Sequence, residues 1–445
     1  MTNVFYRDLK TELPTAVKGE GIYLIDDTGK RYLDASGGAA VSCLGHSDAD
    51  VIQAIKDQVD QVAFAHTGFF TTRPAEDLAE FLVDAAPDGI GMVYFLSGGS
   101  EAVECALKMA RQYFLETGAP ERTRFIARRQ SYHGNTLGAL SVGGNVWRRE
   151  PYKDMLMPAS HIAPCYPYRE RDAGESDAEY GLRIANELEA EIERLGPRNV
   201  AAFIAETVGG ATAGVLAPVP GYFKRIREIC DRYGVLMILD EVMCGMGRTG
   251  TLFACEQDGV APDIVCVAKG LGAGYQPIGA TLVSAKVYDA FKNGSGAFQH
   301  GHTYMGHPTA CAAALAVQRK VRDANLLDNV KAMGNVLVER LHERLGNHPH
   351  VGDIRGRGLF QGIELVADRA TKRTLDPTLK VHAKVKHNAF RRGLICYPAG
   401  GTADGAKGDH ILLAPPFIID KSQINELVDL LGDAIDATLR EAGVM

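Results

Sequence analysis

Short apolar runs alternate with amphipathic helical stretches through the middle of the chain. The clearest run, VLMILD at 235–240, is continuously apolar and follows the helical pattern GYFKRIREICDRYG. Continuous runs are typical of parallel strands, because helices cover both faces of such a sheet. Similar runs lie at 92–96, 124–127, 201–205 and 263–268. The alternation predicts an α/β fold with a large, mainly parallel sheet.

The two ends of the chain have a different pattern. The segment GIYLIDDTGKRYLDASGG predicts a hairpin that turns at 27–29, and a helical stretch follows it. After about residue 330, a long helical stretch precedes short strands near GRGLFQGIEL and HILLAPPFII and a last amphipathic helix. We expect residues 61–329 to form a large domain, since single cores stop growing near roughly 250–300 residues. Residues 1–60 and 330–445 are expected to form a smaller α/β lobe beside it.

Composition narrows the classes of function. The 48 basic residues are outnumbered by 55 acidic ones, and the net charge of −7 argues against a nucleic-acid or anionic membrane surface. Small-molecule substrates are favoured. No apolar run approaches the roughly 18–20 residues of a membrane helix, and the start lacks the order of a secretory signal, so a cytoplasmic protein is expected. The nine cysteines are scattered without CxxC spacing, which predicts buried thiols and neither disulfides nor a metal site.

Candidate binding residues follow the predicted strands, where open parallel sheets bind ligands. A glycine turn with Gly99 and Ser100 follows the run at 92–96 and leads into a helix, whose free N–H groups suit a phosphate. Tyr132 and His133 follow the run at 124–127 and place two flat rings at the same sheet edge. Taken singly, these features are more typical of a tight strand-to-helix turn and of packed aromatic side chains than of a ligand site.

Charged residues follow the remaining runs. Glu206 follows 201–205, and Asp240 ends 235–240, where a carboxylate is costly to desolvate without a cationic partner. Lys269 follows 263–268 and enters a glycine-rich turn, where a lone lysine is usually a surface charge. Together these residues meet the needs of pyridoxal phosphate (PLP): a Schiff-base amine, a partner for the pyridine nitrogen, ring stacking and a phosphate anchor.

Five stretches of the chain carry a family resemblance. They are SGGSEAVECALKMAR, SYHGNTLGAL, LDEVMCGMGRTG, DIVCVAKGLGAGYQPIGA and HGHTYMGHPTACAAALA, in this order. Their order and spacing closely resemble the class III (omega-type) aminotransferases of PLP fold type I, over nearly the whole chain. The blocks around Asp240 and Lys269 are the most specific. The resemblance implies a PLP-dependent transferase whose smaller lobe is formed by both chain ends.

The resemblance also implies roles for single residues. Lys269 would form the Schiff base with PLP and then act as the general base. Asp240 would keep the pyridine nitrogen protonated, which deepens the electron sink. Val242 would pack under the cofactor ring, and Tyr132 would stack above it with His133 beside the site.

Further implied contacts concern the phosphate and the subunit arrangement. Gly99 and Ser100 match the phosphate-binding turn, and Thr303 matches a residue that reaches the phosphate from the neighbouring subunit. The resemblance therefore implies a homodimer with shared active sites, and it leaves open whether dimers pair into tetramers. Glu206 matches a glutamate near the cofactor's phenolic oxygen, although the residues that follow it depart from the family's usual Glu-Pro-Val-Gln-Gly.

The substrate is less closely defined. We expect an amino group to pass from an amine or amino acid, omega-amino substrates included, to a keto acid. Leu412 stands where ornithine-type relatives place a carboxylate-binding arginine, and Lys407 is a candidate in its place. Because no arginine is evident for an acidic side chain, pyruvate is favoured as acceptor.

Other activities of the same fold stay open. The segment TLFACEQDGVAPDI also resembles the dialkylglycine decarboxylases, which carry Trp where this chain has Tyr132, so a transferase is favoured. An aminomutase or racemase would use the same lysine. A non-catalytic PLP-binding protein is less favoured, since the residue set for catalysis is intact.

Overall fold

A seven-stranded sheet forms the centre of the computed structural model, which describes residues 3–445. Its strands, in spatial order, are β4 (Ile90–Leu96), β10 (Gly279–Ser284), β9 (Ile264–Val267), β8 (Leu236–Asp240), β7 (Val200–Glu206), β5 (Arg124–Arg128) and β6 (Ala159–Ile162). Only β10 runs antiparallel to its neighbours, β4 and β9, within this sheet. The mainly parallel sheet predicted from the sequence is confirmed.

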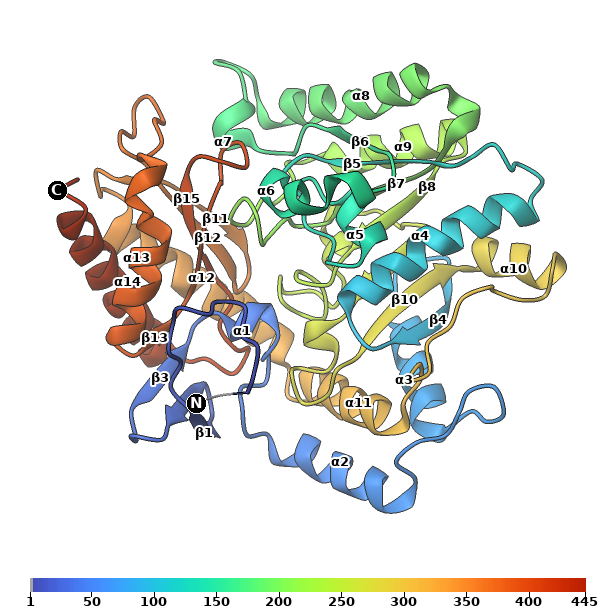
Figure 1. Cartoon of the computed structure of the whole chain (residues 1–445), viewed down its shortest axis with the longest axis horizontal. Helices are drawn as coiled ribbons and strands as arrows, with labels where there is room; N and C mark the ends of the chain where they lie inside the picture. The colour runs from blue at the N-terminus through green and yellow to red at the C-terminus, as the bar shows by residue number, and fades with distance from the viewer. Residues whose placement is uncertain (1–2) are drawn as a thin grey trace.

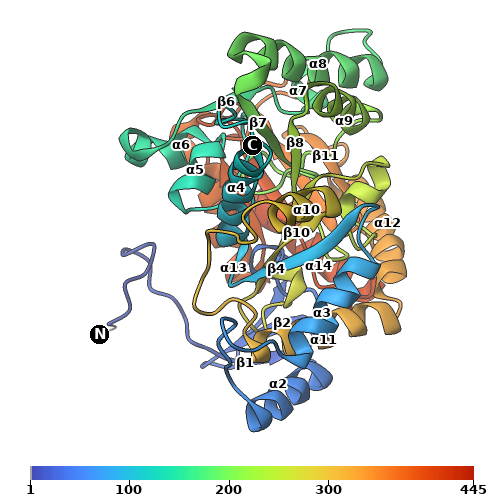
Figure 2. The same cartoon turned by 90° about the vertical axis from the view of Figure 1, so that its right-hand side faces the viewer.

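Both faces of this sheet are buried, which explains the continuous apolar run of β8. Met237 and Leu239 point into a hydrophobic core with α8 (Asp177–Leu195) and α9 (Tyr222–Tyr233). Leu236 and Ile238 point into a second core with α4 (Gly99–Glu116) on the other face. Helices α8 and α9 lie side by side in both views (Figures 1 and 2). Because alternate residues are buried on opposite faces, no position of β8 is left for a polar residue until the strand ends.

The two ends of the chain share a second sheet. It joins β1 (Ala16–Glu20), β2 (Tyr23–Asp26) and β3 (Arg31–Asp34) to β13 (Leu394–Ile395), which is parallel to β3. A third, antiparallel sheet contains β11 (Val351–Arg357), β12 (Phe360–Leu365), β15 (Asp409–Leu413) and β14 (Tyr397–Gly400). Figure 1 shows the blue N-terminal strands beside the orange and red C-terminal elements, to the left of the large sheet.

The remaining helices cover the sheets and link their strands. They are α1 (Gly37–Ala40), α2 (Ala49–Gln61), α3 (Arg73–Asp84), α5 (Leu137–Val142), α6 (Val146–Arg149), α7 (Pro167–Glu170), α10 (Ala285–Asn293), α11 (Pro308–Asp323), α12 (Leu326–Leu345), α13 (Val381–Arg391) and α14 (Lys421–Glu441). Short 3-10 helices are η1 (Glu150–Met155), η2 (Pro197–Asn199), η3 (Ala254–Asp258), η4 (Lys269–Leu271) and η5 (Pro377–Leu379). Within residues 3–445, none of the helices has the length and apolar character needed to cross a membrane.

The nine cysteine side chains are all buried, as predicted. Desolvation raises the pKa of several of these thiols, including Cys43 and Cys311, each to about 12. They therefore stay protonated at neutral pH and contribute to the core as small apolar side chains.

Candidate active site

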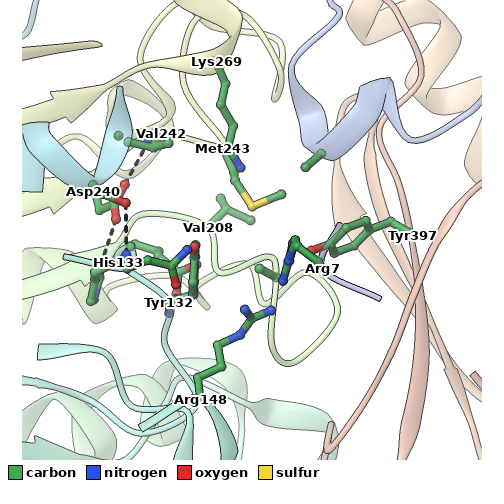
Figure 3. Close-up of a pocket in the computed structure, with 17 residues that line it drawn as sticks. Arg7, Tyr132, His133, Arg148, Val208, Asp240, Val242, Met243, Lys269 and Tyr397 are labelled. Atoms are coloured by element: carbon green, nitrogen blue, oxygen red, sulfur yellow. Dashed lines mark hydrogen bonds and ion pairs between the residues drawn. The ribbon is translucent and has the colours of Figure 1, made fainter. Parts of the chain in front are cut away.

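A cavity of about 260 Å³ lies where the strands of the large sheet end. Figure 3 shows its labelled side chains pointing inward from the sheet, the loops and the N-terminal segment. The lining residues are Arg7, Ala39, Gly99, Ser100, Tyr132, His133, Gly134, Asn135, Arg148, Glu206, Val208, Ala211, Asp240, Val242, Met243, Lys269 and Tyr397. All the cofactor-binding residues proposed from the sequence line this cavity except Thr303, and the proposed carboxylate contact Lys407 does not line it either.

Asp240 and His133 form a buried pair in the cavity wall. Asp240 is the last residue of β8, and its Oδ2 lies 2.8 Å from His133 Nδ1. Its Oδ1 accepts a hydrogen bond of 3.0 Å from the backbone N–H of Val242. The sequence predicted a cationic partner for this carboxylate, and the structure supplies an imidazole and a backbone donor. The contacts hold the carboxylate in one orientation while leaving each oxygen a lone pair for a ligand.

Lys269 enters the cavity from the turn after β9. It has a φ of +47°, which places a non-glycine residue in the left-handed region, where the backbone is strained. Within the described chain, no hydrogen bond or ion pair joins its Nζ to another residue. Burial lowers the pKa of the Lys269 ammonium from 10.5 to about 8, although the nearby carboxylates of Asp240 and Glu206 favour the charged form. Near neutral pH this lysine thus holds a larger share of neutral, nucleophilic amine than a surface lysine does.

Glu206 lies beside Asp240 in the adjacent strand, since the two residues are partners in the parallel register of β7 and β8. Its Oε2 accepts a hydrogen bond from the backbone N–H of Tyr132 at 3.3 Å, and its Oε1 accepts one from Gly210 at 3.2 Å. Burial raises the pKa of Glu206, and the Asp240 charge acts in the same direction. The glutamate therefore positions the loop that carries Tyr132 and can take up a proton in the site.

The glycine turn lies against the loop after β5. Helix α4 begins at Gly99, and Ser100 Oγ accepts a hydrogen bond of 3.0 Å from the backbone N–H of Asn135. A Cβ at Gly99 would lie 2.7 Å from Val242 Cγ1, and one at Gly134 would lie 2.6 Å from Ser100 Oγ. Glycine at both positions is needed for this close approach, which leaves the free N–H groups of the first helical turn facing the cavity.

Three residues named in the sequence analysis lie outside the cavity. Thr303 is exposed, as is Lys407, and neither lines the cavity of its own chain. Leu412 is buried in β15 within an apolar cluster that includes Phe360. Position 412 therefore contributes to packing here and not to ligand binding.

Besides Asn135, which lies two residues after His133, sequence reasoning missed three polar residues of the cavity wall. Arg7 comes from the irregular N-terminal segment, Arg148 from the short helix α6, and Tyr397 from the edge strand β14. None of them follows a strand of the large sheet. The only sequence signal was the basic pair at 148–149 in the loop region after the aromatic motif, and that signal does not point to a site.

Residues 7–435 match the family model for aminotransferase class-III. The chain belongs to the class III aminotransferases. An uncharacterized aminotransferase of Schizosaccharomyces pombe is 49% identical over 98% of this chain and 95% of its own length. A putrescine–pyruvate aminotransferase of Pseudomonas aeruginosa is 37% identical over 95% of this chain and 90% of its own.

Solved structures of this family share the fold. The omega transaminase from Pseudomonas jessenii in complex with PMP superposes with a TM-score of 0.92 and is 33% identical, over 99% of this chain and 97% of that one. This class III aminotransferase thus has the PLP-dependent transferase fold, with PLP as its cofactor. The fold class, enzyme class and cofactor expected from the sequence are confirmed.

Proposed function

We propose that this aminotransferase moves an amino group from an amine or amino acid to a keto acid, with Lys269 as the residue that holds PLP and moves the proton. The observation that carries this proposal is the unpaired, partly buried Lys269 amine in one cavity with the Asp240–His133 pair. The amine is available as a nucleophile, and the carboxylate is fixed in place before any ligand binds.

The residues of the cavity fit the cofactor. When bound, PLP supplies a carbonyl that condenses with amines and a ring that withdraws electrons from the substrate carbon. Asp240 would hold a proton at the ring nitrogen, and the N–H groups at Gly99 and Ser100 would bind the phosphate. Val242 and Tyr132 would contact the cofactor ring.

Proton transfer falls to Lys269. Its Nζ would accept the proton from the amine-bearing carbon of the donor, and burial, which lowers the pKa of this amine, favours the neutral form that can accept it. The buried carboxyl of Glu206 holds Tyr132 in place through the backbone hydrogen bond. Donor and acceptor use the same pocket in turn, which gives ping-pong kinetics.

We propose pyruvate as the acceptor. Support comes from the 37% identical relative named a putrescine–pyruvate aminotransferase. The sequence argument for pyruvate, that no arginine is available, does not stand, because Arg7 and Arg148 line the cavity. Initial rates with pyruvate and with 2-oxoglutarate, at equal donor concentration, test the choice, and a clear preference for 2-oxoglutarate would contradict it.

The first test of the function is the visible absorbance of the PLP-loaded enzyme. Purified enzyme with PLP is expected to be yellow, and borohydride treatment is expected to bleach it and leave the cofactor covalently attached, whereas treated Lys269→Ala releases the cofactor on denaturation. Lys224→Ala, which removes an exposed lysine on α9, is the control and is expected to behave as wild type. Wild type is expected to consume more than one equivalent of amine per cofactor only when a keto acid is added. Carbon dioxide release without a keto acid would instead indicate the decarboxylating alternative.

We also propose a homodimer in which Thr303 completes the partner's site. Thr303 is exposed and lies outside its own cavity, next to Tyr304, which is 62% exposed. The Tyr304 ring contacts the ring of Phe64, which is 39% exposed. Exposed apolar side chains of this size are typical of a subunit interface.

Mixed dimers test this arrangement. If Thr303 serves the partner, a dimer of one Lys269→Ala chain and one Thr303→Ala chain has one intact site and one site with both defects. It is then expected to keep about half of the wild-type activity. If Thr303 serves its own chain, or if the protein is monomeric in solution, the mixture has no intact site and shows only the Thr303→Ala level.

A further inference from the structure

Arg148 carries a positive charge without a protein acceptor in the cavity wall. Within residues 3–445, no ion pair or hydrogen bond joins its guanidinium to another residue, and its Nε is buried. Its backbone N–H donates to Asn145 Oδ1 at 3.3 Å. A guanidinium with buried, unpaired N–H groups is costly unless a ligand accepts from them.

The position of Arg148 is fixed by its neighbours. Its guanidinium lies over the ring of Tyr132 at 4.8 Å and over the ring of Trp147 at 4.4 Å. Stacking of this kind orients the planar guanidinium and leaves its edge free for a bidentate ligand. Arg148 is therefore preorganised, and the fork of N–H groups matches a carboxylate in shape.

A second cation and a phenol lie on the same side of the cavity. Figure 3 shows Arg7 and Tyr397 beside Arg148, across the cavity from Asp240 and His133. No ion pair or hydrogen bond joins the Arg7 side chain or the Tyr397 hydroxyl to another described residue. The two acidic groups of the cavity, Asp240 and Glu206, are already engaged by His133 and backbone N–H groups. The cavity thus has one wall that suits the cofactor and an opposite wall that suits an anion.

We propose that Arg148 binds the carboxylate of the substrate, with Arg7 as a second cationic contact from the N-terminal segment. Arg148 would replace the carboxylate-binding arginine of ornithine-type relatives, whose position is occupied here by the buried Leu412. It selects donors and acceptors that carry a carboxylate, such as amino acids and keto acids, over amines that lack one. This inference rests on the proposed function, because it assigns a substrate class to the same cavity.

The test compares donors with and without a carboxylate. Arg148→Gln is expected to lower kcat/KM for alanine and 4-aminobutyrate by roughly 10- to 100-fold, mainly through KM, because a charge-assisted bidentate contact is lost. The half-reaction with 1-phenylethylamine is followed as the change in cofactor absorbance. Its kcat/KM is expected to stay within about threefold of wild type, because this amine has no carboxylate for Arg148 to bind. Arg149→Gln is the control, because Arg149 is the adjacent half-buried arginine that does not line the cavity.

A binding measurement gives a readout independent of turnover. Butanoate and glutarate are unreactive carboxylates, and their affinity for the PLP-loaded enzyme can be measured by calorimetry. We expect Arg148→Gln to weaken both by at least about tenfold and Arg149→Gln to leave both unchanged. Arg148→Lys is expected to be intermediate, because the charge is kept and the fork is lost. For Arg7→Gln we expect a smaller loss than for Arg148→Gln, since Arg7 lies on an exposed segment.

The outcomes separate the two proposals. If wild type binds the carboxylates through Arg148 but transfers no amino group, the carboxylate site stands and the proposed function fails. If wild type transfers amino groups but Arg148→Gln changes neither carboxylate affinity nor KM, the function stands and the carboxylate site is wrong. An equal loss for 1-phenylethylamine and alanine would show that Arg148 only maintains the cavity, and would also overturn the inference.

Discussion

His133 Nδ1 lies 2.8 Å from Asp240 Oδ2, and both side chains are buried at the end of β8. The imidazole is held in the wall of the cavity, with Nε2 buried and without a partner among the described residues. The aspartate therefore has one oxygen oriented by the imidazole and the other by the Val242 N–H. This arrangement fixes the carboxylate before a ligand binds. Little reorganisation is therefore needed for it to accept a hydrogen bond from the protonated ring nitrogen of the cofactor.

Removal of the Asp240 charge is expected to stop turnover without unfolding the protein. Asp240→Asn should lower kcat by roughly 100-fold or more, because a neutral amide no longer stabilises the protonated ring nitrogen. His133→Gln should cause a smaller loss, on the order of tenfold, because only the orienting contact is lost. Steady-state kinetics measure both effects, and circular dichroism checks the fold. A larger loss for His133→Gln than for Asp240→Asn would contradict this order.

The stability of the PLP-free enzyme is expected to depend on Lys269 above neutral pH. The folded state lowers the pKa of this ammonium from 10.5 to about 8. Between those values the unfolded chain binds more protons than the folded one, so this group makes the folded state more stable as pH rises from 8 toward 10.5. Urea midpoints at pH 7.5 and 9.5 should show this rise in wild type, over and above that of Lys269→Met. Equal changes in the two proteins would argue against a lowered pKa.

The strand ends explain why much of the site could be predicted from the sequence. Glu206, Asp240 and Lys269 each end or follow an apolar run, and parallel strands bring such positions to one sheet edge. Arg148 and Tyr397 reach the cavity only through tertiary packing of a four-residue helix and an edge strand. No periodic pattern marks such positions. The hydrophobic pattern also could not identify His133 as the partner of Asp240, because the two residues are 107 positions apart in the sequence.

Close packing at Gly134 is expected to control cofactor affinity. Gly134 has a φ of +131°, and a Cβ there would lie 2.6 Å from Ser100 Oγ. Gly134→Ala should therefore displace Ser100 and weaken PLP binding by about tenfold or more, since backbone strain of this kind costs on the order of 1–3 kcal/mol. Fluorescence titration of the PLP-free enzyme measures the affinity. Gly118→Ala is the matched control, because Gly118 has a φ of +75° with open space around it. If the two variants lose the same affinity, the contact with Ser100 is not the cause.

The buried carboxylate of Glu364 is expected to hold the third sheet, which contains β12, against α7 without affecting catalysis. Glu364 lies in β12 and is fully buried, and it accepts hydrogen bonds from Tyr166, from Arg169 Nε at 2.6 Å and from Arg355 Nη1 at 2.8 Å. Glu364→Gln leaves two arginines without their shared anion, so we expect a loss of about 3 kcal/mol in the free energy of unfolding. Urea denaturation measures this loss, and kcat should be unchanged at temperatures where the variant is folded. Glu343→Gln, which breaks the exposed pair with Arg340, should cost less than about 1 kcal/mol. A comparable loss in the two variants would mean that Glu364 contributes no more than a surface ion pair does.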